Sequence, residues 1–265
     1  MSVRHLDCGT MRPPFVRGGL PCHVLLVERD EGLVLVDSGY GMHDIDRPVV
    51  RLGGNRTLMR PVLTAAQTAV HQVRDAGYHP RDVRDIVLTH LDPDHVGGIA
   101  DFPWARVHVT AAERAAAATP QTAGERARYR PAQLAHHPTL VEHTPDGDAW
   151  WGLGAAQEVL PGVVLIALPG HSRGHAAVAV DAGGRWVLHV GDAFYHRSQV
   201  TEGGSTPWLL RTMERSMAID RDRVEQNHRR IAELIARDEP GLLVVNAHDP
   251  EMLRDARRVD RGATL

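Results

Sequence analysis

The sequence predicts an α+β fold in which two β-sheets pack face to face, with helices on their outer sides. Each half of the 265-residue chain contains short apolar segments typical of buried strands, followed by a segment with the apolar periodicity of a helix. The two halves are therefore alike in element order, although no repeat of fixed short period is found. A chain of this length can bury a full core, in one large domain or two small ones.

The first half is predicted to begin with a hairpin whose strands, 22–28 and 33–37, are joined by four residues that include Gly32. Residues 9–21 contain three prolines and three glycines and predict a loop that can lie over a site. Apolar periodicity indicates a helix over 62–77. Further segments predict a strand at 85–88, a strand at 107–109 and an Ala-rich helix over about 110–118.

The second half contains four apolar strand candidates, at 163–168, 176–180, 186–190 and 242–246. A helix is predicted over 220–237, with Asp220 as its N-cap. Residues 119–156 have scattered proline, glycine, histidine and threonine, and we interpret them as a pocket-flanking insertion.

Composition narrows the class of protein. The net charge is −3 and 24% of residues are charged, so no basic field favours nucleic acid, and a small-molecule substrate is expected. No stretch of 18 apolar residues could span a membrane. The two cysteines, Cys8 and Cys22, and the absence of a secretory pattern in the first residues predict a cytoplasmic protein. The oligomeric state is left open.

Four side chains able to bind metal lie within six residues, directly after the predicted strand at 85–88: His90, Asp92, Asp94 and His95. Pro93 disfavours helix at the residue before it, so this segment is predicted to be a shaped loop. Imidazoles and carboxylates packed so densely would be electrostatically unfavourable unless a cation neutralised them. The alternative is a polar turn with two surface histidines.

Three more candidate ligands follow other predicted strands, namely His171, Asp192 and His248. Loops at one edge of a rigid sheet scaffold can assemble a site from distant parts of a sequence. The donors are nitrogen and carboxylate oxygen without thiolate, which suits zinc, iron or manganese in an open catalytic site.

These motifs, in this order, resemble the metallo-β-lactamase superfamily, and within it the N-acyl homoserine lactonases and related hydrolases. The motifs that carry the resemblance are Asp37, His90-x-Asp92-x-Asp94-His95, Pro169-Gly170-His171, Gly191-Asp192 and Ala247-His248-Asp249. The resemblance implies a single αββα four-layer domain over 1–265 with two divalent metal ions. One metal would be held by His90, position 92 and His171, the other by Asp94, His95 and His248, with Asp192 bridging them.

The resemblance also implies roles around the metals. Asp37 would orient a ligand, most plausibly a histidine, and His175 would be a neighbour of His171 rather than a ligand. Tyr195 would stabilise a developing oxyanion, or alternatively pack at the base of a loop. Asp94 would also carry a proton to the leaving group. The expected apolar pocket walls are Trp150, Trp151, Phe194 and Trp208, on loops that include 196–215.

Asp92 departs from the family motif, which usually has histidine at this position. A carboxylate here would shift metal preference from zinc toward iron or manganese, or would turn away and leave a weaker first site. The leading hypothesis is a hydrolase of an ester, lactone or thioester that uses a metal-bound hydroxide at a dinuclear site, with zinc as the expected metal. The alternatives are a di-iron oxygen-activating enzyme, a small phosphodiesterase and a non-catalytic binding module.

Overall fold

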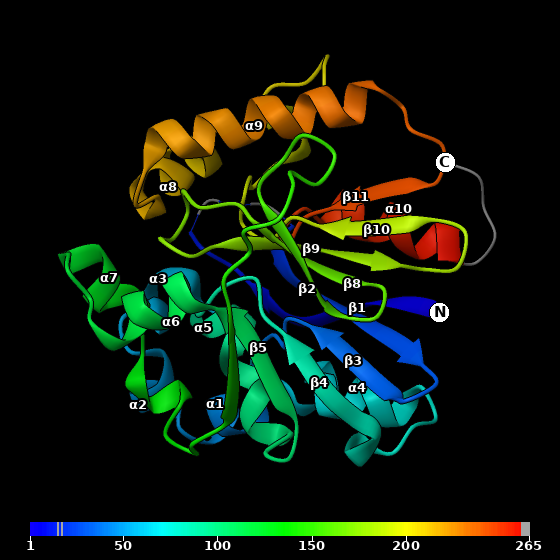
Figure 1. Ribbon diagram of the computed structural model, residues 1–265. Helices are drawn as coiled ribbons and strands as arrows, with labels where there is room; N and C mark the ends of the chain where they lie inside the picture. The colour runs from blue at the N-terminus through cyan, green and yellow to red at the C-terminus, as the bar shows by residue number, and fades with distance from the viewer. Residues whose placement is uncertain (15, 17, 261–265) are drawn as a thin grey trace.

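Two facing sheets form the centre of the protein in the computed structural model, which describes residues 1–14, 16 and 18–260 (Figure 1). The first sheet has the order β1-β2-β3-β4-β5-β6 and the second the order β11-β10-β9-β8-β7. The strands of the first sheet are β1 (Ser2–Met11), β2 (Leu20–Arg29), β3 (Gly32–Val36), β4 (Val83–Val87), β5 (Arg106–Thr110) and β6 (Thr139–His143). Those of the second are β7 (Ala156–Leu160), β8 (Val163–Ala167), β9 (Ala176–Asp181), β10 (Trp186–His189) and β11 (Leu242–Val245).

Both sheets are mixed. The strands β1, β2 and β3 pair antiparallel, whereas β3 through β6 pair parallel. In the second sheet β7 through β10 are antiparallel and β11 joins β10 in parallel. The α-helices are α1 (Met42–Asp46), α2 (Pro48–Leu52), α3 (Asn55–Met59), α4 (Ala69–Asp75), α5 (Pro93–Val96), α6 (Ala111–Ala118), α7 (Ala123–Arg128), α8 (Trp208–Met217), α9 (Arg221–Ala236) and α10 (Pro250–Asp260).

Alternation of side chains along the strands divides the core into layers. Inner-face residues such as Val27 and Val36 pack with Val178 of the opposite sheet. On the outer face of the first sheet, Val73 of α4 packs in the same cluster as Ile86, and Ile231 of α9 does the same for the second sheet. Figure 1 shows α4 and α9 on opposite outer sides of the two sheets. The predicted αββα arrangement is therefore confirmed.

The N-terminal region differs from the prediction. The loop predicted over 9–21 is shorter at both ends, because β1 extends to Met11 and β2 begins at Leu20, and the described residues between them belong to no strand or helix. The sequence did not indicate β1, since its polar residues obscure the alternation: His5 is buried and its Nδ1 lies 2.8 Å from His23 Nε2 of the neighbouring strand.

The predicted helix over 62–77 is shorter than expected. It consists of α4 preceded by a 3₁₀ turn at Ala65–Gln67, and the extended backbone of Thr68 separates the two. Val62 instead forms a bridge with Thr10 of β1. The short helices α1, α2 and α3 were not predicted, because each is about one turn long and has no apolar period to detect.

Residues 119–156 are not one long loop. They contain α7, a 3₁₀ turn at Pro131–Gln133 and β6, which extends the first sheet by parallel pairing with β5. Residues 196–215, expected as a loop, include the first part of α8. The predicted helix over 220–237 is confirmed as α9, and the Asp220 side chain accepts a hydrogen bond from the Arg223 N–H. Among the described residues, no helix combines the length and apolarity that a membrane-spanning segment needs.

Candidate metal centre

The segment after β4 is shaped by Pro93. Asp92, which precedes the proline, is extended (φ −70°, ψ 149°) and is the N-cap of α5, whose first residue is Pro93. Gly97 and Gly98 follow, and a Cβ at either would clash, with the Asp44 carboxylate and the Ser38 backbone respectively. The two glycines therefore let this segment lie directly against the loop after β3.

The seven candidate ligands predicted from the sequence lie close together, each in a loop or short helix beyond the end of β4, β8, β10 or β11. We define the first donor group as His90, Asp92 and His171, and the second donor group as Asp94, His95 and His248; within each, the candidate ligand atoms lie within 4.8 Å of one another.

In the first donor group, Asp92 Oδ2 lies 3.2 Å from His171 Nε2 and 3.4 Å from His90 Nε2. In the second donor group, Asp94 Oδ2 lies 3.5 Å from His95 Nε2 and 3.4 Å from His248 Nε2. The carboxylate oxygens therefore face the Nε2 atoms of the imidazoles in both groups.

Asp192 lies between the two groups. Its Oδ1 is 3.0 Å from His248 Nε2 and 3.3 Å from His95 Nε2. Its Oδ2 is 3.5 Å from His171 Nε2 and 4.0 Å from His90 Nε2. One carboxylate thus presents an oxygen to each group, which is the placement that a bridging ligand requires.

Unpartnered polar atoms test whether a metal fits here. His90 Nε2, His95 Nε2 and Asp192 Oδ1 are buried and make no hydrogen bond within the described part of the chain. Buried polar groups are rarely left without a partner, and nitrogen and carboxylate donors without thiolate suit zinc, iron or manganese. The residues present therefore fit divalent metal ions.

Neighbouring groups orient the histidines so that their Nε2 atoms face inward. Asp37 Oδ2 accepts a hydrogen bond from His95 Nδ1 at 2.8 Å, and Pro21 O accepts one from His248 Nδ1 at 2.7 Å. Asp37 has a φ of 59°, a left-handed conformation that is strained for a residue with a side chain. Its Oδ1 also accepts from the Thr89 N–H at 2.8 Å, so Asp37 fixes the start of the loop that carries the donors.

His175 lies next to His171, with the two ring centroids 5.8 Å apart, and its hydrogen bonds position Asp192. Its Nδ1 donates to Leu168 O at 2.9 Å, which leaves Nε2 to accept a hydrogen bond from the Asp192 N–H at 3.0 Å. The backbone of the central carboxylate is therefore held by a buried imidazole.

The electrostatics of the metal-free protein follow from this packing. Burial opposes charging of His95, but the carboxylates of Asp192, Asp37 and Asp94 outweigh it and raise the pKa of His95 well above its usual value. Burial and the neighbouring His95 lower the pKa of His90 to about 4. A proton on His95 thus partly takes the place of a metal ion in compensating the carboxylates.

Two buried charged residues were missed by the sequence analysis. Glu113 of α6 accepts hydrogen bonds from Leu91 N at 3.0 Å, Ser172 Oγ at 2.7 Å and Gly174 N at 3.1 Å. It looked like an ordinary first-turn glutamate of an Ala-rich helix. Arg128, at the end of α7, places Nη1 3.4 Å from Asp92 Oδ2. No local pattern indicated it.

Tyr195 lies beside the donor groups. Its ring is buried, with its centroid 5.8 Å from that of His248 and 6.1 Å from that of His171. Burial and the nearby Asp192 raise the pKa of its phenol well above the usual value, so the hydroxyl stays protonated.

The four predicted pocket walls do not lie at this centre. Phe194 is fully buried in the core between the second sheet and α9, because adjacent residues point to opposite sides and Tyr195 takes the side of the donors. Trp150 stacks on Trp151 and packs edge-on against Trp186. Trp208, the first residue of α8, is 69% exposed. This part of the prediction is wrong, because sequence proximity does not give side-chain direction.

Methionine and leucine side chains surround the centre instead. The residues that line a narrow hollow over the donors are Met11, Leu20, Tyr40, Asn55, Met59, Asp92, Asp94, Asp192, Tyr195, Met213, Met217 and His248. A cavity of about 420 Å³ shares Leu20, Tyr195 and His248 with it and is also lined by Leu209 and Leu210. The apolar walls thus come from β1, β2, α3 and α8.

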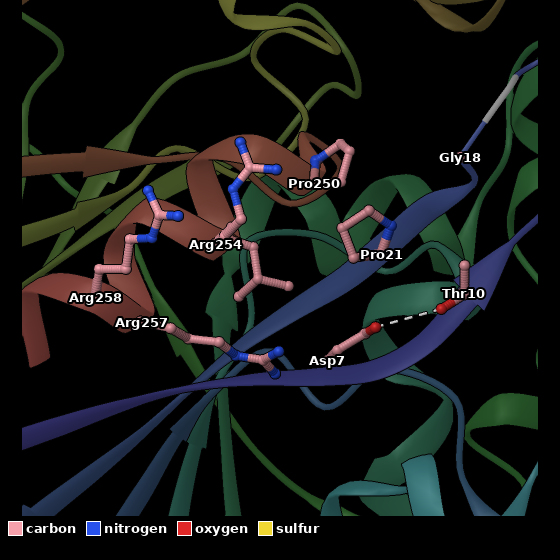
Figure 2. A pocket seen from close by; sticks show the side chains of 9 residues that line it. Asp7, Thr10, Gly18, Pro21, Pro250, Arg254, Arg257 and Arg258 are labelled. Atoms are coloured by element: carbon pink, nitrogen blue, oxygen red, sulfur yellow. Dashed lines mark hydrogen bonds between the residues drawn. The ribbon is translucent and has the colours of Figure 1, made fainter. Parts of the chain in front are cut away.

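A different cavity, of about 410 Å³, lies between β1 and α10 (Figure 2). Arg254, Arg257 and Arg258 line it, and Figure 2 shows Arg257 extending toward Asp7, which hydrogen-bonds Thr10. None of the seven donors lines this cavity, so it is distinct from the candidate metal centre.

Comparison with known proteins gives relatives along nearly the whole chain. A family model described as the metallo-beta-lactamase superfamily matches residues 17–248. A protein of Mycobacterium tuberculosis named as a probable metallo-hydrolase is 51% identical over 260 residues, which cover 97% of this chain and 83% of that protein. An N-acyl homoserine lactonase of Rhizobium johnstonii is 28% identical over 238 residues, 87% of this chain and 82% of that protein.

Solved structures give the same fold. An N-acyl homoserine lactone hydrolase, with N-hexanoyl-L-homoserine bound at its catalytic metal centre, has a TM-score of 0.68 at 23% identity, over 96% of this chain and 97% of that chain. A dizinc quorum-quenching lactonase has a TM-score of 0.61 at 18% identity, over 88% and 74% of the two chains. The sequence match and the shared fold agree, and this chain belongs to the metallo-β-lactamase superfamily.

Proposed function

We propose that this protein is a metal-dependent hydrolase that cleaves an ester, lactone or thioester at a dinuclear centre. The observation that carries the proposal is the position of Asp192, whose two oxygens face the two donor groups. The names of the relatives support hydrolysis, and the more distant lactonases support the class of bond.

The metal ligands, Asp94 and Tyr195 have different roles in this proposal. Two divalent ions held by the two donor groups and Asp192 would lower the pKa of a shared water and polarise the substrate carbonyl. Asp94 is the most open carboxylate of the set, with 13% of its side chain exposed, so it is the residue best placed to pass a proton to the leaving group. The protonated phenol of Tyr195 can donate a hydrogen bond to the developing oxyanion.

The walls indicate an apolar acyl or alkyl group next to the scissile bond. Four methionines line the hollow over the donors, from β1, α3 and α8: Met11, Met59, Met213 and Met217. Methionine adapts to irregular apolar shapes and favours binding of flexible chains. Substrates with a chain of several methylene groups should therefore be preferred over their acetyl analogues.

The test combines metal analysis with a substrate panel. Elemental analysis of protein purified without added metal is expected to give two divalent ions per chain. Lactones, aryl esters and thioesters of increasing chain length are then assayed with the wild type and with Asp192→Ala, which should lose turnover. His79→Ala is the matched control, because His79 is exposed and precedes the start of β4, whereas the donors follow the other end of this strand. Undiminished turnover by metal-stripped Asp192→Ala would end the proposal.

Asp92 favours one alternative, a di-iron enzyme that activates oxygen, because a carboxylate in the first donor group suits iron better than a third imidazole would. Stoichiometric iron with an optical spectrum that changes on reduction and exposure to air would support it. Stoichiometric zinc without iron would count against it. Turnover of bis(p-nitrophenyl) phosphate in place of carboxyl esters would instead favour a small phosphodiesterase.

A further inference from the structure

We propose that Arg128 is the permanent counter-charge of Asp92, and that the two residues together stand in for a neutral imidazole in the first donor group. The inference rests on the proposed function, because it takes Asp92 to be a metal ligand. It assigns to Arg128 the role of setting how strongly this group binds a cation.

The position of Arg128 is fixed by two helices that lie at the same end of the molecule as α5 (Figure 1). Its Nη1 lies 3.4 Å from Asp92 Oδ2, and its Nη2 donates to Met217 O near the end of α8 at 2.5 Å. The residue is 3% exposed. A guanidinium held in this way cannot turn to solvent.

The helix that carries Arg128 is itself anchored. Thr122 and Glu125 form a capping box at the start of α7, and the Glu125 carboxylate also binds Arg173 at 2.5 Å. Arg173 follows His171 by two residues in the loop of the first donor group. The helix that supplies the counter-charge is therefore tied to the loop that supplies a donor.

Charge and burial explain why the pair occurs together. An unpaired carboxylate or guanidinium at such depth would be strongly unfavourable, whereas the two compensate each other. Asp92 is buried like Arg128, so solvent screens neither charge. When the imidazoles are neutral, the charges of Asp92 and Arg128 cancel. The first donor group together with Arg128 then has a net charge of zero, which is also the net charge of three neutral histidines.

The contact leaves the carboxylate available to a metal. Nη1 makes no hydrogen bond among the described residues, and Asp92 Oδ2 lies as near to His171 Nε2, at 3.2 Å, as to the guanidinium. Arg128 thus reduces the negative charge that a cation would meet without closing off the oxygen. Its removal should strengthen cation binding, and removal of Asp92 alone should weaken it through repulsion by the unpaired guanidinium.

A double-mutant cycle tests this with Asp92→His, Arg128→Met and the double variant, and Arg128→Lys is the control that keeps the charge. Metal-stripped proteins are titrated with cobalt(II), followed by visible absorption and by elemental analysis of the bound ions. His171→Ala and His248→Ala, which each remove a donor from one group, assign the two binding steps. These are readouts of binding and do not depend on turnover.

Arg128→Met is expected to tighten cobalt binding to the first donor group, because the repulsion between the guanidinium and the cation is removed. We expect a change of about 10- to 100-fold, the size by which partners of metal ligands alter affinity but with the opposite sign, and a much smaller change in Arg128→Lys. Asp92→His should weaken cobalt binding to this group by at least about 10-fold. The cobalt affinity of the double variant should be close to that of the wild type, so the effects of the two substitutions are not additive. Urea unfolding of the metal-free proteins should follow the same pattern, with each single variant less stable than the double variant.

An unchanged affinity in Arg128→Met overturns the inference. The inference is also overturned if Asp92→His changes the cobalt affinity equally in the presence and in the absence of Arg128. If Asp92→His fails to fold, the comparison of Arg128→Met with Arg128→Lys decides alone. A wild-type protein that binds no cobalt would overturn the proposed function and this inference together, whereas normal wild-type binding with an additive cycle overturns the inference only.

Discussion

Glu113 joins two loops that carry the first donor group, and its replacement should separate them. Its Oε1 accepts from Leu91 N in the loop of His90 and Asp92. Its Oε2 accepts from Ser172 Oγ and Gly174 N in the loop of His171. The Glu113 side chain is fully buried, so the groups that donate hydrogen bonds to it are shielded from water.

The magnitude follows from the groups left behind. Glu113→Ala leaves two buried backbone N–H groups without an acceptor, at about 1–3 kcal/mol each. Burial raises the pKa of Glu113, so part of this loss is offset because the cost of burying a carboxylate disappears. We expect the free energy of unfolding to fall by about 2–4 kcal/mol, and by about half as much in Glu113→Gln, which keeps one acceptor oxygen.

The assay is urea unfolding of the protein with its metals as purified, combined with elemental analysis. Glu142→Ala, an exposed residue of β6, is the matched control and should change stability by less than about 0.5 kcal/mol. Glu113→Ala should also retain less metal, with the loss at the first donor group. An unfolding midpoint equal to that of Glu142→Ala, with full metal content, would refute this account of Glu113.

Three further outcomes are expected. Burial beside His189, Arg185 and Arg257 lowers the pKa of His5 from 6.5 to about 3, so below pH 6.5 the unfolded chain binds a proton that the folded protein refuses. Stability should therefore fall with pH below 6.5, and less steeply in His5→Gln; equal slopes in urea titrations at pH 7.5 and 5 would contradict this. Tyr195→Phe should lower kcat by about 100-fold with little change in KM, whereas a raised KM at unchanged kcat would assign the phenol to substrate binding. Removal of metal by a chelator should lower Tm, because buried carboxylates lose their compensation, and an unchanged Tm would contradict the proposed centre.

The sequence predicts those strands whose residues are apolar on both faces. The segments that became β2, β8 and β9 are nearly continuous runs of such residues, since each is covered on two sides. The strand β1 escaped prediction because its buried polar side chain His5 finds its partner on another strand. The short helices near α2 depend similarly on distant contacts, such as the hydrogen bond that Arg51 Nη2 donates to Gly97 O, 46 residues away, at 3.0 Å.

In the candidate metal centre too, residues with a local sequence pattern could be predicted, whereas residues that depend on distant contacts could not. The candidate ligands could be predicted because each follows the end of an apolar strand, where a motif is visible locally. Arg128 and Glu113 have no local signature, since Arg128 contacts a carbonyl 89 residues away and Glu113 contacts a hydroxyl 59 residues away. Phe194 and Tyr195 are adjacent aromatic residues with opposite directions, and only the packed structure separates core from cavity.

The charges of the centre bear on how many metal ions it can hold. Five carboxylates surround it and a single guanidinium, that of Arg128, faces them within the described residues. The carboxylates are those of Asp37, Asp92, Asp94, Glu113 and Asp192. With all five ionised and the imidazoles neutral, the excess of negative charge equals the charge of two divalent cations. One ion would leave part of it uncompensated at low local dielectric, where such an imbalance is costly. The arrangement of Asp192 between the two donor groups and the total charge therefore both support a dinuclear centre. A wild-type protein that takes up a single ion at saturation would show that two protons, on these carboxylates or on the imidazoles, compensate the remaining negative charge.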